Sequence, residues 1–380
     1  MAGIYIHIPF CKQACHYCDF HFNTSLKYKD EMIEALVREI EMRKHYLINE
    51  EVKTIYFGGG TPSIVPARDI EKILQAIYDR FQLSAVPEIT LEANPDDLSK
   101  EHLYALHQVG INRLSIGVQS FIDRDLVWMN RAHHKDEALT SIKRAQDIGI
   151  ENISIDLIYG TPNLTDREWL DNIQQALELE VPHISSYALT VEKGTALGNW
   201  VEKKKQKPID EEQAASQFEI LMEELAANGY DHYEISNFAK PGYYSKHNSS
   251  YWEGSRYMGI GPSAHSFNKT SREWNVANNQ KYLNDIYSDV LPSQTEQLKL
   301  NDRFNEYLMV SFRTSKGVNI KYIEDEFGSS VLAEFAENVQ EYISKKWLVL
   351  EKGFYKTTKE GKLMADKIAS ELFTLENFEK

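Results

Sequence analysis

The sequence predicts an α/β fold in which a partial barrel of six strand–helix units precedes a small winged-helix-like α+β domain. Three observations lead to this prediction. Short apolar runs alternate six times with segments of helical periodicity. Glycine and proline follow two of the predicted strands, at 58–62 and 160–162. From about residue 294 the pattern changes to helices and one hairpin. Six units are fewer than the eight of a closed barrel, so we expect an open side, with an open doubly wound sheet as the alternative.

Length and charge set the class of protein. A chain of 380 residues can bury a large core and predicts roughly two domains. The formal net charge of -15 argues against a nucleic-acid partner. No run of about 18 apolar residues occurs, so no transmembrane segment is expected. The N-terminal residues lack the basic start and the cleavage site of a signal peptide. We therefore expect a cytoplasmic protein in a reducing compartment, with peripheral contact to the membrane left open.

Each predicted strand is a short apolar run that ends at a proline, a glycine or a polar residue. The strands cover residues 3–8, 53–57, 88–93, 113–118, 152–158 and 183–189. Each predicted helix carries apolar residues at three- and four-residue spacing. The helices cover residues 27–46, 70–81, 100–109, 135–148, 166–179 and 210–228. This order predicts a parallel sheet with helices on its outside, and ligands at the carboxyl ends of the strands.

The remaining segments are less regular. Residues 198–208 are rich in lysine and predict a solvated loop, and 230–267 are rich in aromatic residues without a clear period. Helices are expected at 296–313 and 331–345, and a hairpin at 347–356 with Gly353 in its turn. Because this last part mixes acidic and basic residues and shows no basic stripe, it predicts a cap or partner-binding module. We expect three parts, and they cover residues 1–240, 241–292 and 293–380.

All three cysteines of the chain lie in one CxxxCxxC array directly after the first strand. They are Cys11, Cys15 and Cys18. Three thiolates within eight residues can close around one metal centre. Iron–sulfur clusters are normally held by four cysteines, so three would leave one iron open to a small molecule.

Two other interpretations of the array remain open. A structural zinc site would need a fourth ligand, which His7, His16 or His21 could supply. Three unrelated free cysteines are also compatible with the sequence, since cysteine is often buried as a small apolar residue. The odd number and the tight spacing disfavour a disulfide framework.

The array and its flanking residues, Tyr5-x-His7-x-Pro9-x-Cys11 and onward, resemble the motif of radical S-adenosylmethionine proteins. The likeness is to the branch of oxygen-independent coproporphyrinogen oxidase, and it covers nearly the whole chain. It implies a four-iron four-sulfur cluster whose open iron is chelated by S-adenosylmethionine. It also implies that electron transfer into the sulfonium releases a 5′-deoxyadenosyl radical.

The same resemblance implies a set of residues that contact S-adenosylmethionine. They are Tyr5, Gly60, Thr61, Glu92, Gln119, Arg131 and Asp156. Carboxylates suit ribose hydroxyls and an ammonium group, and an arginine suits a carboxylate. Considered without the resemblance, the polar residues would be strand-end groups that cap loops, and 58–60 would be a tight turn.

Two further features distinguish an oxidase from a carrier. The oxidases of this branch have a fourth cysteine two places after the third, where this chain has Phe20. The stretch His247-Asn-Ser-Ser-Tyr251-Trp252 resembles the HNxxYW motif of haem-carrying relatives in the branch. A histidine is a natural axial ligand of haem iron, and His265 is a second candidate.

The resemblance therefore implies a haem chaperone that binds haem near His247 and passes it to an acceptor haem protein. The expected acceptor is a membrane-associated respiratory enzyme, and the chaperone could act as a dimer. An oxygen-independent coproporphyrinogen III oxidase, or another radical tetrapyrrole enzyme, is the alternative. A winged-helix regulator with a structural metal is a third interpretation, which the acidic composition disfavours.

Overall fold

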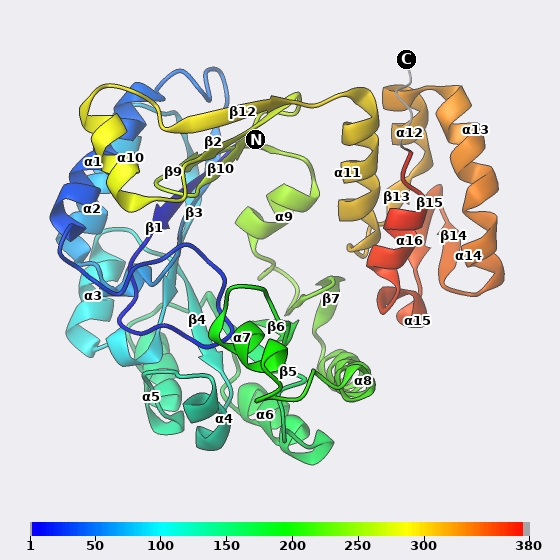
Figure 1. Ribbon diagram of the computed structural model, residues 1–380, viewed down its shortest axis with the longest axis horizontal. Coiled ribbons are helices and arrows are strands. Elements are labelled where there is room, and N and C mark those ends of the chain that lie inside the picture. The colour runs from blue at the N-terminus through cyan, green and yellow to red at the C-terminus, as the bar shows by residue number, and fades with distance from the viewer. Residues whose placement is uncertain (1, 375–380) are drawn as a thin grey trace.

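The computed structural model describes residues 2–374, and it confirms the predicted α/β fold with an open, partial barrel. Six parallel strands lie side by side in chain order. They are β1 (Ala2–Ile8), β2 (Val52–Gly59), β3 (Leu83–Ala93), β4 (Arg113–Gln119), β5 (Ile153–Tyr159) and β6 (His183–Ala188). Figure 1 shows these strands on the inner side of a curved wall.

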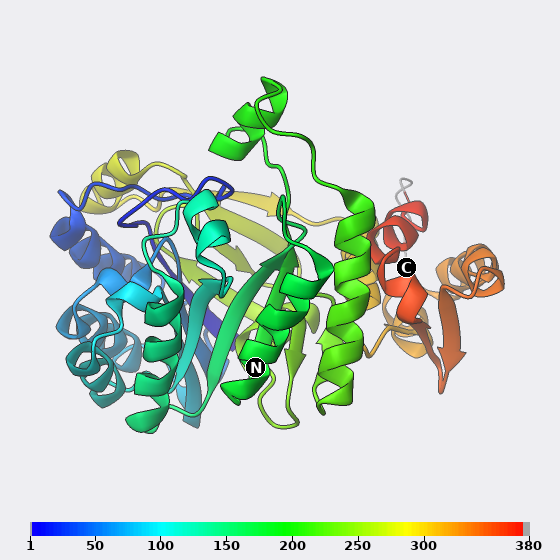
Figure 2. The ribbon, with the colours of Figure 1, turned by 90° about the horizontal axis from the view of Figure 1, so that it is seen from below.

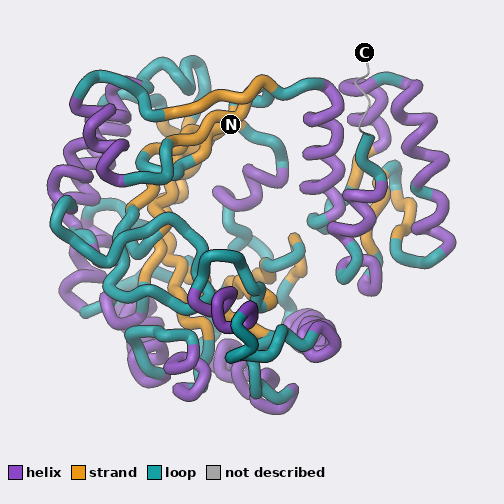
Figure 3. The backbone as a smooth tube through the Cα atoms, viewed as in Figure 1, coloured by secondary structure: helices purple, strands orange, loops and turns teal. Residues whose placement is uncertain are grey.

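The six predicted helices cover the outer face of this sheet (Figures 2 and 3). They are α1 (Lys29–Met42), α2 (Ala67–Tyr78), α3 (Lys100–Gln108), α5 (Lys135–Asp147), α6 (Asp166–Glu178) and α8 (Glu211–Ala227). Helix α2 shows the packing rule, because its buried residues recur at three- and four-residue spacing, from Ile70 to Ile77. Two short helices, α4 (Asp123–Trp128) and α7 (Ala196–Glu202), were not predicted. The expected loop at 198–208 is therefore wrong for its first residues.

The sheet extends beyond the six predicted strands at both edges. Next to β6 lie β8 (Asn237–Ala239) and β7 (Asp231–Glu234). Next to β1 lies β9 (Arg256–Ile260), which pairs in parallel, followed by three antiparallel strands. Those are β10 (His265–Phe267), β11 (Ser271–Asn275) and β12 (Ser293–Gln297). Two helices belong to this extension, α9 (Lys246–Trp252) and α10 (Asn279–Tyr287). The part expected to connect two domains thus contributes strands to the main sheet.

The C-terminal part forms a separate domain of helices around a three-stranded sheet. Its helices are α11 (Leu300–Phe312), α12 (Ile320–Phe327), α13 (Ser329–Asn338), α14 (Gln340–Ser344), α15 (Lys359–Lys362) and α16 (Ala365–Glu371). Its strands are β13 (Val318–Asn319), β14 (Leu348–Glu351) and β15 (Phe354–Thr357). The predicted hairpin is confirmed, with Lys352 and Gly353 both at positive φ in its turn. The helix expected at 331–345 is divided between α13 and α14, and the one expected at 296–313 begins only at Leu300.

The main sheet with its extension and the C-terminal domain each have a hydrophobic core of their own. The larger core includes Met258, Tyr282 and Ile286 from the extension, whereas the smaller one gathers Phe304, Phe327 and Phe335. The three boundaries expected from the sequence stay a proposal. Among the helices of residues 2–374, none combines the length and the apolar character needed to cross a bilayer.

Candidate functional site: a cysteine loop beside an interdomain cleft

The cysteine loop leaves the carboxyl end of β1 and is closed by backbone hydrogen bonds. The N–H of Cys11 donates to the carbonyl of Asn23 at 3.1 Å, and the N–H of Asn23 donates to the carbonyl of Pro9 at 2.9 Å. All three cysteines are free thiols that are partly exposed. Within residues 2–374, no three His, Cys, Asp or Glu side chains are gathered closely enough to bind a single metal ion.

Burial and the neighbouring cysteines make the thiols of Cys11 and Cys18 weak acids. Burial raises the pKa of Cys11 to about 11, against a lowering by the hydroxyl of Thr61. Burial, with a contribution from the charges of Cys15 and Cys11, raises the pKa of Cys18 to about 12. At neutral pH the thiols of Cys11 and Cys18 are therefore protonated in the metal-free protein, and binding of a metal centre must release these protons.

The histidines considered as a fourth zinc ligand have other partners. A ring nitrogen of His16 lies 2.7 Å from the carbonyl of Trp128, and one of His7 lies 2.8 Å from the carbonyl of His21. The ring of His21 in turn lies 2.7 Å from the side-chain oxygen of Asn279. Each of these three imidazoles is thus held by a hydrogen bond to a different part of the protein.

The glycine run at the end of β2 allows that strand to approach the cysteine loop. Gly59 has φ +105, and a Cβ there would lie 2.5 Å from the ring of His7. A Cβ on Gly60 would lie 2.5 Å from the carbonyl oxygen of Phe10. The chain then places Thr61 so that its hydroxyl donates to the sulfur of Cys11 at 3.4 Å. These glycines serve a close backbone approach, which a residue with a side chain would prevent.

Glu92 at the end of β3 is the acceptor for this glycine run. Its carboxylate accepts from the N–H of Gly59 at 3.1 Å and from the hydroxyl of Tyr56 at 2.9 Å. Tyr5 stacks on Tyr56, with ring centroids 6.1 Å apart. Burial, with a contribution from the charge of the nearby Asp156, raises the pKa of Glu92 to about 7. The carboxyl group is therefore poised between its neutral and charged forms near neutral pH.

Arg131 links the cysteine loop to the ends of β3 and β4. Its guanidinium donates to the sulfur of Cys15 at 3.4 Å, to the side chain of Asn94 at 2.7 Å and to the carbonyl of Gly117 at 2.7 Å. Its buried Nε has no hydrogen-bond partner within the described chain. A buried cation with one free donor fits an anionic group of a ligand.

Gln119 and Asp156 belong to the next two strands, β4 and β5. Gln119 lies at the end of β4 with φ +65, a strained conformation for a residue with a side chain. Asp156 accepts from the hydroxyl of Ser115 at 3.4 Å, and burial raises its pKa to about 6. Of the seven residues that the resemblance implies for S-adenosylmethionine, Thr61 and Arg131 thus contact the cysteines directly, and the assignment of the set stays a prediction. The structure adds Tyr56 and Asn94 to this group. In the sequence Tyr56 stands two residues before the glycine run and Asn94 two residues after Glu92, and this nearness could have indicated them.

His247 lies inside the protein, directly behind Tyr56 of this group. Its ring is 1% exposed and has partners at both nitrogens, with the hydroxyl of Thr54 at 2.8 Å and that of Tyr251 at 2.8 Å. Its ring also stacks on Tyr56, and its backbone N–H donates to Glu88 at 3.0 Å. Burial lowers the pKa of His247 to about 3, so the ring is neutral.

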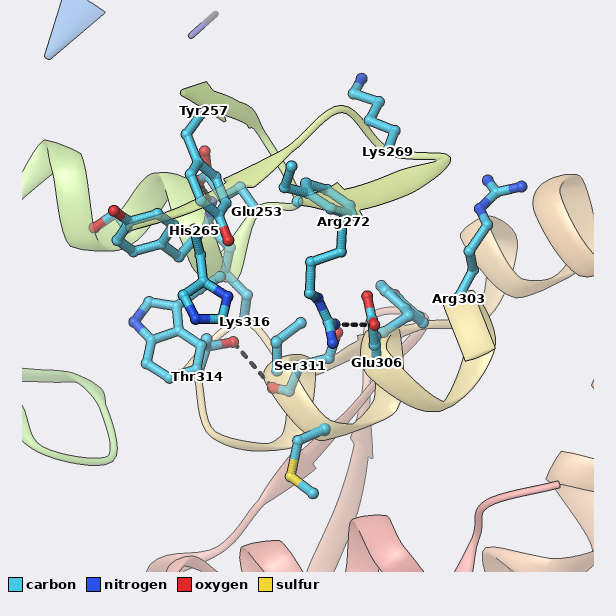
Figure 4. Close-up of a pocket in the computed structure, with 18 of the residues that line it drawn as sticks. Glu253, Tyr257, His265, Lys269, Arg272, Arg303, Glu306, Ser311, Thr314 and Lys316 are labelled. Atoms are coloured by element: carbon cyan, nitrogen blue, oxygen red, sulfur yellow. Dashed lines mark hydrogen bonds and ion pairs between the residues drawn. The ribbon is translucent and has the colours of Figure 1, made fainter. Parts of the chain in front are cut away.

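A large cleft separates the sheet extension from the C-terminal domain. It has a volume of about 1520 Å³, and we call it the interdomain cleft. One wall carries Tyr251, Trp252 and Tyr257, and α11 supplies much of the opposite wall. The cleft also reaches Tyr5 and Phe20 beside the cysteine loop. Figure 4 shows Arg272 pointing across it toward Glu306, with which it forms an ion pair.

Comparisons with known proteins agree with this arrangement. Residues 5–176 match the family described as Radical SAM superfamily, and residues 298–364 match the HemN C-terminal domain. Similar proteins include one of Bacillus subtilis named "Heme chaperone HemW", 35% identical over 97% of this chain and 98% of its own length. Another of the same name, from Escherichia coli, is 38% identical over 69% of each chain.

A solved structure shows the same fold. The coproporphyrinogen III oxidase HemN of Escherichia coli, described as a radical SAM enzyme, superposes with a TM-score of 0.84. The match covers 98% of this chain and 90% of that one, at 22% identity. The partial barrel and the C-terminal domain therefore occur together in an experimental structure.

Proposed function

Since the chain belongs to the family of the relatives named Heme chaperone HemW, a branch of the radical SAM superfamily, we propose that it binds haem and passes it to an acceptor haem protein. The observation that carries this proposal is the interdomain cleft, which borders both the HNxxYW motif and the cysteine loop. Its volume of about 1520 Å³ exceeds that of a typical small-ligand site, and a carrier needs an open site from which its cargo can leave.

The superfamily implies a four-iron four-sulfur cluster and S-adenosylmethionine, and the residues present fit both groups. Three thiols share one short loop, the glycine run lets the end of β2 approach that loop closely, and Arg131 keeps a free buried donor. Cys11, Cys15 and Cys18 would hold the cluster. The residues that would hold S-adenosylmethionine are Tyr5, Gly60, Thr61, Glu92, Gln119, Arg131 and Asp156. When bound, the two groups supply one-electron chemistry at a sulfonium centre.

The chain's own residues orient and insulate that site. Glu92 fixes the backbone N–H of Gly59, so the neighbouring carbonyl and N–H groups keep a defined direction. Arg131 holds the loop of Cys15 against the ends of two strands and adds positive charge beside a centre built on thiolates.

The haem site belongs at the HNxxYW motif. Tyr251 and Trp252 face the interdomain cleft and offer flat apolar surfaces to a macrocycle. His247 lies behind Tyr251 and holds its hydroxyl, so it contributes to the site through Tyr251. Direct ligation of iron by His247 requires Tyr251 to release the ring nitrogen first.

The test uses full-length protein purified without oxygen, with its cluster reconstituted. We expect titration with haemin to give a saturable Soret band, and addition of an apo-haem protein to withdraw the haem. A protein that gives no such band, or that converts coproporphyrinogen III with S-adenosylmethionine under reducing conditions, would contradict the carrier function.

We also propose an acceptor and a place of action for the carrier. The acceptor is a membrane-associated respiratory haem enzyme, and the carrier works in the cytoplasm, in transient contact with the membrane and as a dimer. Light scattering with and without S-adenosylmethionine tests the dimer. Flotation with vesicles that contain the acceptor tests the membrane contact, which should vanish with protein-free vesicles.

A further inference from the structure

Three histidines line the interdomain cleft, and they differ in what their rings do. The ring of His7 is buried between Tyr5 and the backbone of His21, at 3.2 and 2.8 Å. The ring of His21 is hydrogen-bonded to Asn279 at 2.7 Å. Within residues 2–374, no hydrogen-bond partner of the His265 ring is found, and this residue is exposed. Of these three histidines, only His265 has a ring in the cleft without a hydrogen bond to another residue of the described chain.

The sheet extension fixes the direction of this imidazole. His265 begins β10 and pairs with Trp274 of β11, and the two rings stack with centroids 6.3 Å apart and planes inclined by 27°. Figure 4 shows the ring projecting between the sheet extension and the segment that carries Thr314 and Lys316. A ligand that enters between the two bodies therefore meets this ring.

The surroundings match the rest of a haem molecule. Tyr257, Phe267 and Trp252 provide apolar surface, and the indole N–H of Trp252 has no acceptor in the described part of the chain. Two arginines of the cleft are held by carboxylates, Arg272 by Glu306 and Arg303 by Glu326. A carboxylate-bearing ligand can take the place of these glutamates, because arginine binds carboxylates through two parallel hydrogen bonds.

We propose that His265 is the axial ligand of haem iron in the interdomain cleft, while His247 positions Tyr251 in the cleft wall. This inference rests on the proposed carrier function. The cleft walls shield the ring of His265 partly from water, and this desolvation and the charge of Arg272 lower its pKa, which favours the neutral form that a metal ligand needs. The two arginines bind the haem propionates, and the release of Glu306 and Glu326 accompanies binding.

The experiment compares haemin binding by the full-length wild type and four variants, followed by absorption and electron paramagnetic resonance. We expect His265→Ala to weaken haemin binding by roughly 10- to 100-fold. His265→Tyr should replace the imidazole signal by that of phenolate-ligated, high-spin iron. His45→Ala, at an exposed position outside the cleft, should keep the wild-type affinity and spectrum, and the haem bound to His247→Ala should keep the wild-type spectrum.

Each other outcome decides against the inference in a distinct way. If the wild type binds no haemin, the carrier function fails and this ligand assignment fails with it. If the wild type binds haemin and both His265 variants keep its spectrum, the carrier function stands and only the assignment of His265 is overturned. Loss of the imidazole signal in His247→Ala alone would transfer the ligand role to His247.

Discussion

The carboxylate of Glu92 accepts a hydrogen bond of 3.1 Å from the backbone N–H of Gly59, across the ends of β3 and β2. It is partly buried and also accepts from the hydroxyl of Tyr56 at 2.9 Å. The backbone geometry next to the cysteine loop therefore depends on one ionisable group. That group should make both stability and cofactor binding depend on pH.

Replacing Glu92 by glutamine tests this dependence. Because the folded-state pKa of about 7 lies above the ordinary value of 4.5, the folded protein binds more protons than the unfolded chain between these two pH values. Stability should therefore fall as the pH rises from about 5 to 8. In Glu92→Gln this fall should be smaller by on the order of 1–3 kcal/mol, with a residual fall from Asp156, whose pKa is raised to about 6.

The measurement is urea unfolding of metal-free protein at pH 5 and pH 8. Glu71→Gln, at an exposed position of α2, is the control and should keep the wild-type pH dependence. Equal falls in the wild type and in Glu92→Gln would show that Glu92 does not titrate in this range.

Arg131→Lys should weaken binding of S-adenosylmethionine and leave the cluster in place. Lysine keeps the charge but cannot contact Asn94, Gly117 and Cys15 together, as the guanidinium does. We expect the dissociation constant to rise by roughly 10- to 100-fold, about 1.4–2.7 kcal/mol. Equilibrium binding to cluster-loaded protein measures it. Arg144→Lys, which alters a guanidinium bonded to the carbonyl of Leu98, is the control. Unchanged affinity in Arg131→Lys would remove this residue from the cofactor site.

Single alanine substitutions of Cys11, Cys15 and Cys18 should each abolish iron binding. The thiols are partly exposed, so the unfolding free energy of the metal-free protein should change by less than about 1 kcal/mol. Iron and sulfide analysis after anaerobic reconstitution measures the loss, and zinc is determined in the same samples. A wild type that carries one zinc ion and no iron would favour the zinc interpretation of the array.

His247→Ala should destabilise the fold even without haem. The substitution leaves the hydroxyl groups of Thr54 and Tyr251 without their partner and opens a cavity beside Tyr56. We expect a loss of about 2–4 kcal/mol in the free energy of unfolding. Urea denaturation measures it, with His45→Ala at an exposed position as the control. A loss below that of the control would show that the buried imidazole contributes little.

The same histidine shows where sequence reasoning stops. The six strand–helix units could be predicted because each is encoded in a local apolar period, and the cysteine array because its ligands are neighbours in the chain. The burial of His247 depends on Thr54, which is 193 residues away in sequence, and on a glycine at position 3 that leaves room for its ring. No local pattern reports such a contact.

The sheet extension was missed for a related physical reason. Strands β8 and β10 have three residues each, too few to show an alternation, and β9 pairs with β1 from the opposite end of the barrel sequence. As a consequence, His265 could be predicted as a candidate ligand from the sequence, but its position in a cleft could not. The positive φ of Gln119 could not be predicted either, because glutamine has no particular preference for this backbone conformation.

Phe20→Ala should separate haem binding from stability. Phe20 occupies the place of the fourth cysteine of the oxidases, is 67% exposed and lines the interdomain cleft beside the cysteine loop. Because its ring is mostly in solvent, its removal should change the free energy of unfolding by less than about 0.5 kcal/mol. A haem in the cleft would lose an apolar contact worth about 1–2 kcal/mol, so its affinity should fall by roughly 5- to 30-fold. Haemin titration measures this fall, and Tyr104→Ala on α3, which removes an aromatic ring that is 58% exposed away from the cleft, should leave it unchanged. Equal haemin affinities in the wild type and in Phe20→Ala would place the haem away from the cysteine loop.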